Sequence, residues 1–110
     1  MKYIVTKRPG EPAQLVEHPD QGVSFQTLKD GVNGGYFEVV PFPGDRGVDI
    51  WCDEEGALKE LPFNFWHPGM GQPIMGHVIA CAHDEDGDSI PISKFKALAV
   101  KNWLDNCARV

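Results

Sequence analysis

The chain has 110 residues, of which 42% are hydrophobic and 24% are charged, values typical of one small globular domain. This composition excludes a disordered tail, a collagen-like fibre and a coiled coil, and no apolar run approaches the ~18 residues of a membrane helix. Ten Lys and Arg against sixteen Asp and Glu give a net charge of −6, which disfavours binding to nucleic-acid phosphates. We therefore expect residues 1–110 to form a single domain with no nucleic-acid partner and no membrane contact.

The first third of the chain predicts a hairpin followed by a helix. β-branched residues favour a strand over residues 3–7, and the Pro-Gly turn at 9–12 leads to a partner strand over 14–18. Ser24 is a good N-cap because its hydroxyl can accept a free amide of the first turn. The helix is expected to end at Asn33-Gly34-Gly35, because Gly readily adopts the left-handed conformation found at helix C-termini.

The middle of the chain predicts strands around a long loop. Aromatic and β-branched residues predict strands over residues 36–40 and 48–53, the second with strict alternation. The Gly- and Pro-rich stretch 57–73 is the least regular part and is predicted to be a long loop of the kind that often binds ligands. The apolar run 74–82 is typical of a central strand covered on both faces.

The last part of the chain predicts a turn, an edge strand and a helix. The Asp-Gly turn at 84–88 precedes a short strand over 89–92, which Pro91 would confine to an edge. A helix over 94–108 would face the core with a stripe of Ala99, Trp103 and Cys107, flanked by Val100 and Leu104. The predicted fold class is α+β, with a mainly antiparallel sheet of about five or six strands, one short helix and a C-terminal helix packed on it.

The thiols and imidazoles do not form a recognisable reactive or metal-binding pattern. Cys52, Cys81 and Cys107 are widely spaced in apolar settings, which predicts buried, reduced thiols and a cytoplasmic location. His77, Cys81 and His83 share one face of a strand, but they are too far apart along it for a zinc site. We expect no metal and no cofactor.

An acidic turn resembles the start of a calcium loop without completing it. Asp84, Asp86 and Asp88 have the right spacing, but Ser89 and Phe95 stand where Gly and Glu are required. A solvated turn is therefore expected. The chain also lacks a nucleophile elbow and a phosphate-binding glycine loop, so we expect no catalytic residue and no enzyme.

The segment from Pro62 to His67 is the strongest candidate for binding. Three aromatic rings beside an Asn and a His could stack on a flat surface and read donor and acceptor edges. The competing interpretation, that Phe63 and Trp66 tuck under the loop as a small core, remains open. The candidate binding residues are Phe63, Asn64, Phe65, Trp66, His67, Gly34 and Gly35.

Four short motifs together resemble a family borne by phages and plasmids, domain of unknown function 3846. They lie in order over residues 1–95, with Asp53 in place of Asn and Phe65-Trp66 in place of Arg-Ala. The resemblance implies an accessory protein inside a bacterium and implies no activity. The motifs are Gly34-Gly35-Tyr36, Cys52-Asp53-Glu54-Glu55-Gly56, Leu61-Pro62-Phe63-Asn64 and Ile74-Met75-Gly76-His77-Val78.

Two functions from different classes follow. The first is a non-catalytic protein that binds a host or phage protein, for instance to block a defence system, with the aromatic segment as the hot spot. The second is a binder that sequesters a small ligand such as a nucleotide signal, although few basic residues lie near the segment, Arg46 and Lys59 being the nearest. The edge strand over 89–92 could also pair with a second copy to form a homodimer.

Overall fold

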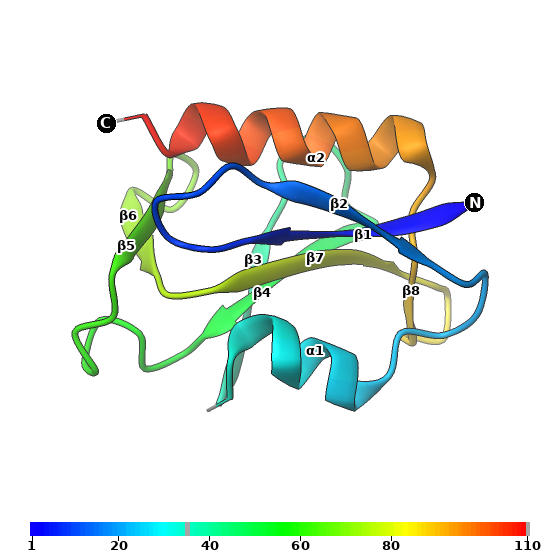
Figure 1. Cartoon of the computed structure of the whole chain (residues 1–110), viewed down its shortest axis with the longest axis horizontal. Helices are drawn as coiled ribbons and strands as arrows, with labels where there is room; N and C mark the ends of the chain where they lie inside the picture. The colour runs from blue at the N-terminus through cyan, green and yellow to red at the C-terminus, as the bar shows by residue number, and fades with distance from the viewer. Residues whose placement is uncertain (35, 110) are drawn as a thin grey trace.

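The computed structural model describes residues 1–34 and 36–109, and Figure 1 shows its elements. In chain order they are β1 (Lys2–Lys7), β2 (Gln14–His18), α1 (Phe25–Val32), β3 (Phe37–Pro41), β4 (Val48–Asp53), β5 (Phe63–His67), β6 (Gln72–Met75), β7 (Val78–His83), β8 (Ser89–Ile90) and α2 (Lys94–Cys107).

The main sheet is antiparallel throughout its described pairings. Its order is β2-β1-β7-β4-β3, with β8 paired to β7. Helix α1 lies on one face and α2 on the other (Figure 1). The predicted α+β class is confirmed, and no described helix is long and apolar enough to cross a membrane.

The central strand β7 is buried on both faces, as the apolar run 74–82 predicts, but it begins at Val78. Residues 74 and 75 belong to β6, and Gly76 at φ 86° turns the chain between the two strands. Ile79 and Cys81 belong to the core under α1, whereas Val78 and Ala80 belong to the core under α2. Because side chains alternate along a strand, only a continuous apolar run can serve two cores at once.

Helix α1 begins and ends as predicted. Ser24 Oγ accepts the N–H of Thr27, and Asn33 closes the helix in the left-handed region at φ 67°. Gly31 lets the helix approach β7 closely, since a Cβ at this position would lie 2.7 Å from the Cβ of Ile79. Gly35 lies outside the described residues.

Helix α2 forms, but its predicted stripe is rotated. Ala97, Val100 and Leu104 are its buried residues, whereas Ala99 is exposed and Trp103 lies at the margin of the core. The bulky Trp103 ring reaches the core from the side of the helix, so the small residues at 97 and 100 face the sheet directly.

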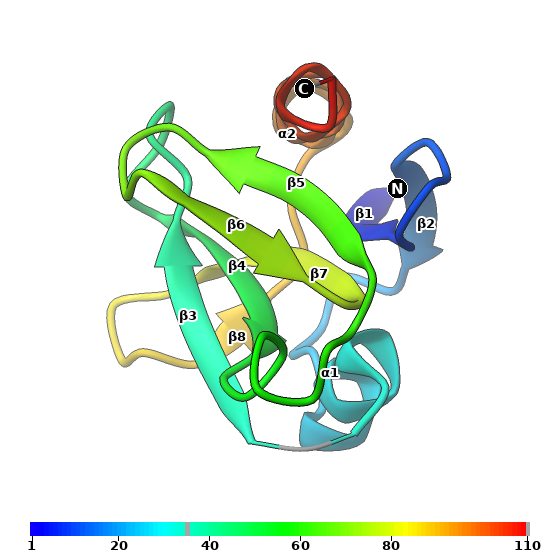
Figure 2. The ribbon, with the colours of Figure 1, turned by 90° about the vertical axis from the view of Figure 1, so that its left-hand side faces the viewer.

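The prediction of a loop over residues 57–73 is wrong from Phe63 onward, where the chain forms two strands. Strands β5 and β6 pair as a two-stranded sheet, with Phe65 and Ile74 in the core under α2. Figure 2 shows this hairpin in front of the main sheet, with α2 above it and α1 below. The two buried side chains anchor the hairpin, which explains why a stretch rich in Gly and Pro is regular.

The final strand is shorter than predicted. β8 ends at Ile90 because Pro91 has no N–H for a ladder. Beyond it, Ile92 forms a bridge to Tyr3 through two backbone bonds of 2.8 Å. This bridge ties the start of α2 to β1.

Candidate functional site

The predicted aromatic segment is a strand with two different faces. Trp66 is 41% exposed and Phe63 is partly buried, whereas Phe65, Asn64 and His67 are buried. The expectation that the rings of this segment are presented for binding is therefore wrong for Phe65, and the candidate binding residues Asn64 and His67 are buried as well. Alternation along β5 sends Phe65 and His67 toward α2 and leaves the Trp66 ring on the outer face.

Buried His67 joins the hairpin to its neighbours. Its Nδ1 accepts the N–H of Met70 at 3.1 Å, so Nε2 carries the proton and donates to the carbonyl oxygen of Pro41 at 2.7 Å. The Trp103 ring meets His67 edge-on at 5.3 Å and Phe65 at 5.6 Å between centroids. His67 therefore holds the hairpin tip in place and is not available to a ligand.

Asn64 links three segments from inside the protein. Its Nδ2 donates to the carbonyl oxygens of Lys7 at 2.9 Å and Gly76 at 2.8 Å. These two acceptors determine the orientation of the amide, because a flipped amide would set oxygen against oxygen. The Oδ1 atom is buried and has no partner among the described residues.

Gly34 lies beyond the end of α1 at φ +90°, and a Cβ there would meet nothing within 4 Å. Its neighbour Asn33 lines a pocket of about 510 Å³ together with Leu61, Pro62 and His77. Leu61 and Pro62 open the segment that contains the aromatic residues. The structure thus brings the end of α1 near the start of that segment, not near its exposed ring.

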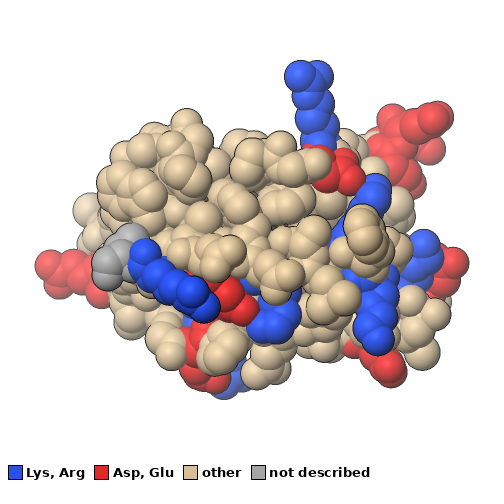
Figure 3. Space-filling view, turned by 90° about the horizontal axis from the view of Figure 1, so that it is seen from above, with Lys and Arg blue, Asp and Glu red and all other residues tan. Residues whose placement is uncertain are grey.

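The outer side of the hairpin carries a cluster of exposed apolar residues, here called the hairpin surface. Trp66 lies opposite Pro73 in the strand pair, and Pro68 and Met70 follow at the tip. From Leu61 to His83 the sequence has no Lys, Arg, Asp or Glu. Seen from above, a broad area at the upper left of the molecule is tan, without blue basic or red acidic side chains (Figure 3). This uncharged run is a sequence signal for the surface that motif spacing does not reveal.

Sequence patterns do not point to Lys7, although it is the most unusual ionisable group near the predicted site. It is 3% exposed, and its Nζ donates to the carbonyl oxygen of Asn64 at 3.3 Å and, at the limit of a hydrogen bond, to that of Arg8 at 3.5 Å. Burial lowers the pKa of Lys7, and the charges of Asp105 and Glu11 only partly oppose this effect.

Lys7 lines a pocket between the β1–β2 turn, β5 and the end of α2, here called the Lys7 pocket. Its volume is about 430 Å³, and its lining includes Phe63, Asn64, Glu11, Asp105 and Arg109. The structure thus brings two of the predicted binding residues, Phe63 and Asn64, to one pocket.

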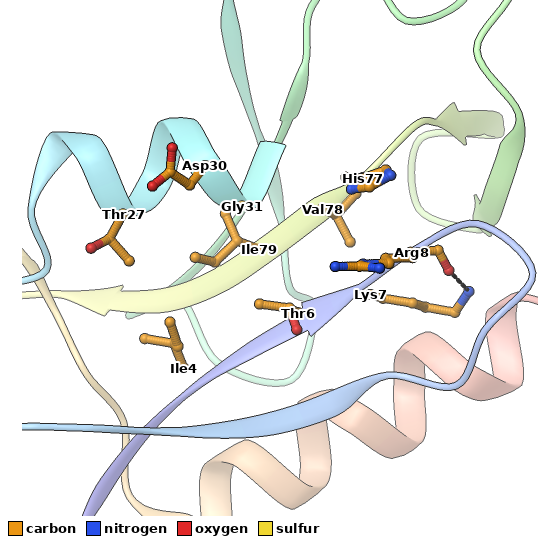
Figure 4. Close-up of a pocket in the computed structure, with 10 residues that line it drawn as sticks. All are labelled: Ile4, Thr6, Lys7, Arg8, Thr27, Asp30, Gly31, His77, Val78 and Ile79. Carbon is orange, nitrogen blue, oxygen red and sulfur yellow. Dashed lines mark hydrogen bonds between the residues drawn. The ribbon is translucent and has the colours of Figure 1, made fainter. Parts of the chain in front are cut away.

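A separate pocket of about 270 Å³ lies on the opposite face of β1. Figure 4 shows Arg8 and His77 at one end of it and Thr27 and Asp30 of α1 at the other. The bond from Lys7 Nζ to the Arg8 carbonyl is drawn there as a dashed line. Lys7 therefore lines both this pocket and the Lys7 pocket, whereas Arg8 lines only this one of the two.

Two cysteines and the acidic turn, which the sequence analysis considered for chemistry, are buried or hydrogen-bonded locally. Burial raises the pKa of Cys52 to about 12 and that of Cys81 to about 11, so both thiols stay protonated near neutral pH. Asp84 Oδ1 accepts the N–H groups of Asp86 and Asp88, which accounts for the acidic turn as a local hydrogen-bonded loop.

Asp105 ties the β1–β2 turn to α2, and this link predicts a pH-dependent loss of stability. Its carboxylate accepts the N–H of Ala13 and pairs with Lys101, each at 2.7 Å. Burial acts to raise the pKa of Asp105, but these partners outweigh it and the pKa lies below its usual value of 3.8. A carboxyl with a lowered pKa stabilises the fold above its unfolded pKa, and this is lost as pH falls through the folded pKa.

We therefore expect Asp105→Asn to reduce the free energy of unfolding by about 1–2 kcal/mol at neutral pH. The difference from the wild type should shrink below about pH 4, where the wild-type carboxyl itself begins to be protonated. Urea unfolding of both proteins across this range measures it. A difference that stays constant with pH would contradict the assignment.

Comparison with known proteins gives one match. The family model described as Domain of unknown function (DUF3846) matches residues 1–105, which confirms the resemblance indicated by the four motifs. No curated protein and no solved structure matches the chain. The matched range includes the hairpin surface and Lys7, but not Arg109.

Proposed function

Because the chain belongs to the DUF3846 family, whose description assigns no activity, we propose from its surface that it is a non-catalytic protein that binds another protein. The docking site is the hairpin surface. The partner is a host or phage protein in the bacterial cytoplasm, such as a component of a defence system, and the chain is an accessory protein of a phage or plasmid.

The exposed Trp66 carries this proposal. Tryptophan is among the residues most enriched at interface hot spots, and it is here 41% exposed on a rigid two-stranded sheet. Phe65 and His67 anchor that strand from behind, so the ring is presented without a large entropic cost of ordering. Pro68, Met70 and Pro73 extend the apolar contact around it.

The absence of charge between Leu61 and His83 indicates what the partner must offer. Because this run contributes no charge to the hairpin surface, charge pairs across the interface would add little to the affinity there. The hairpin surface instead matches an apolar pocket wide enough for an indole. Binding should therefore depend little on salt.

The nucleotide alternative has weaker support. The Lys7 pocket contains Phe63 and Asn64, yet its two cationic residues, Lys7 and Arg109, are matched by Glu11 and Asp105. A nucleotide carries several negative charges, which this balance does not compensate. The geometry therefore favours the protein partner.

The test is quantitative capture from host lysate followed by affinity measurement with the purified partner. Trp66→Ser should weaken binding about 30-fold or more, which corresponds to a hot-spot loss of about 2 kcal/mol. Phe95→Ser is the matched control, because Phe95 is an aromatic residue 84% exposed at the far end of the molecule, on the first turn of α2. Equal affinity of wild type and Trp66→Ser, or an equal loss in both variants, would refute the proposal.

A further inference from the structure

The Lys7 pocket has a buried positive charge at its floor. Lysine is rarely buried without a paired carboxylate, because removing an ammonium from water costs far more than a neutral hydrogen bond returns. Here no carboxylate oxygen of the described residues lies within 4.0 Å of Lys7 Nζ. Its partners are two backbone carbonyls at 3.3 and 3.5 Å, both long for a charged donor.

The acids that line the pocket do not form a direct ion pair with Lys7. Asp105 is already engaged by the Ala13 N–H and by Lys101. Glu11 is exposed at the rim, where solvent screens it. An anionic group placed at Lys7 would therefore meet one unsatisfied cation.

Asn64, which also lines the pocket, has a buried side-chain acceptor without a partner. Asn64 is 1% exposed, both hydrogens of its Nδ2 are used, and its Oδ1 lacks a donor among the described residues. A buried polar atom without a partner costs roughly 1–3 kcal/mol, which a bound group with an O–H or N–H would remove. Phe63 and Pro12 supply apolar lining to the same pocket.

We propose that the Lys7 pocket binds a small organic monocarboxylate that carries a hydroxyl or amino donor next to the carboxylate. The carboxylate accepts from Lys7 Nζ, and an apolar body lies against Phe63. Binding uncovers the buried Asn64 Oδ1, which the donor then reaches. The pocket volume of about 430 Å³ is sufficient for a ligand of about a dozen heavy atoms. This inference is independent of the hairpin surface, which lies on the outer side of β5 and β6.

The proposal is tested by titrating isotope-labelled full-length protein with 3-phenyllactate while its backbone amide resonances are recorded. Saturable shifts are expected at Phe63, Asn64 and Ala108, with a millimolar or tighter dissociation constant. Two further probes test the hydroxyl requirement and the identity of the anionic group. 3-Phenylpropanoate lacks the hydroxyl and should bind about tenfold more weakly, and adenosine monophosphate tests for a phosphate ligand.

Lys7→Met supplies the decisive variant, because Met fills a similar volume without the buried charge and should leave the protein at least as stable. It should weaken 3-phenyllactate binding tenfold or more. Lys2→Met, the same type of change on the same strand but outside the pocket, should leave binding within about twofold.

Four results would overturn the proposal. One is the absence of a saturable shift at these residues up to ~50 mM probe, since the dissociation constant would then be larger than that of a specific site. Another is unchanged binding in Lys7→Met. The third is tighter binding of adenosine monophosphate than of 3-phenyllactate, which would assign the pocket to a phosphate ligand instead. Equal binding of 3-phenylpropanoate and 3-phenyllactate would remove the Asn64 contact from the proposal and so refute the hydroxyl requirement.

Discussion

Replacing Phe65 with Ala should reduce the free energy of unfolding by about 3–5 kcal/mol, the usual cost of deleting a fully buried aromatic ring. Phe65 is 0% exposed, and its ring packs edge-on against Trp103 of α2. A small domain has only about 5–15 kcal/mol of total stability, so much of the margin would be lost. Urea unfolding followed by Trp fluorescence measures the change.

The neighbouring residue provides the control for this prediction. Trp66→Ala removes a larger side chain from the next position of the same strand, but that side chain is 41% exposed. Its cost should stay below about 1 kcal/mol. If Trp66→Ala cost as much as Phe65→Ala, the assigned facing of β5 would be wrong, and so would the hairpin surface.

Asn64→Ala should be the second most damaging single change, at about 2–3 kcal/mol. The substitution leaves the buried carbonyl oxygens of Lys7 and Gly76 without their side-chain donor, and each such loss typically costs 1–3 kcal/mol. The loss of unfolding free energy stays below the sum of these two costs, because the variant also removes the buried Oδ1 atom, whose missing partner destabilises the wild type. The same unfolding measurement at neutral pH applies.

Asn102→Ala is the matched control, because Asn102 is exposed on α2. Its effect should lie within about 0.5 kcal/mol of zero, and Ala even has the higher helix propensity. A loss below about 1 kcal/mol in Asn64→Ala would show that the strand β5 is held to β1 and to the β6–β7 turn mainly by packing, with little contribution from the amide.

The elements that depend on local chemistry were predictable. Ser24 begins α1 and Asn33 ends it because capping involves residues within one turn of each other. The central strand was predictable from the apolar run 74–82, although the structure divides this run between β6 and β7 and only residues 78–83 form the central strand. In both cases the information needed lies within a short window of sequence.

The strand β5 was missed for the opposite reason. Pro62, Pro68 and three Gly or Pro positions beyond it indicate a loop locally. What makes the segment a strand is the burial of Phe65 and Ile74 under α2, about thirty residues away in the chain. Propensity is weak compared with tertiary packing in such a segment.

The predicted binding segment stays a prediction as a site, and its expected outward orientation is only partly correct. Phe63 and Trp66 remain accessible, whereas Asn64, Phe65 and His67 serve the interior. A long loop imposes no alternation, so a prediction of a loop carries no information about which side chain points outward. Once the segment is a strand, alternation assigns the faces of Phe65, Trp66 and His67, whereas the register shift between Phe63 and Phe65 interrupts it at the start of the strand.

The sequence alone determined the α+β class, the two helices and their caps, and the family, because these depend on local patterns and on motifs in a set order. Only the tertiary structure decided which rings of residues 63–67 are exposed, and only it placed the Lys7 ammonium beside Asn64, 57 residues along the chain. The physical reason is that burial and charge pairing are properties of neighbours in space, and β1 meets β5 only after the sheet, the hairpin and α2 have packed together.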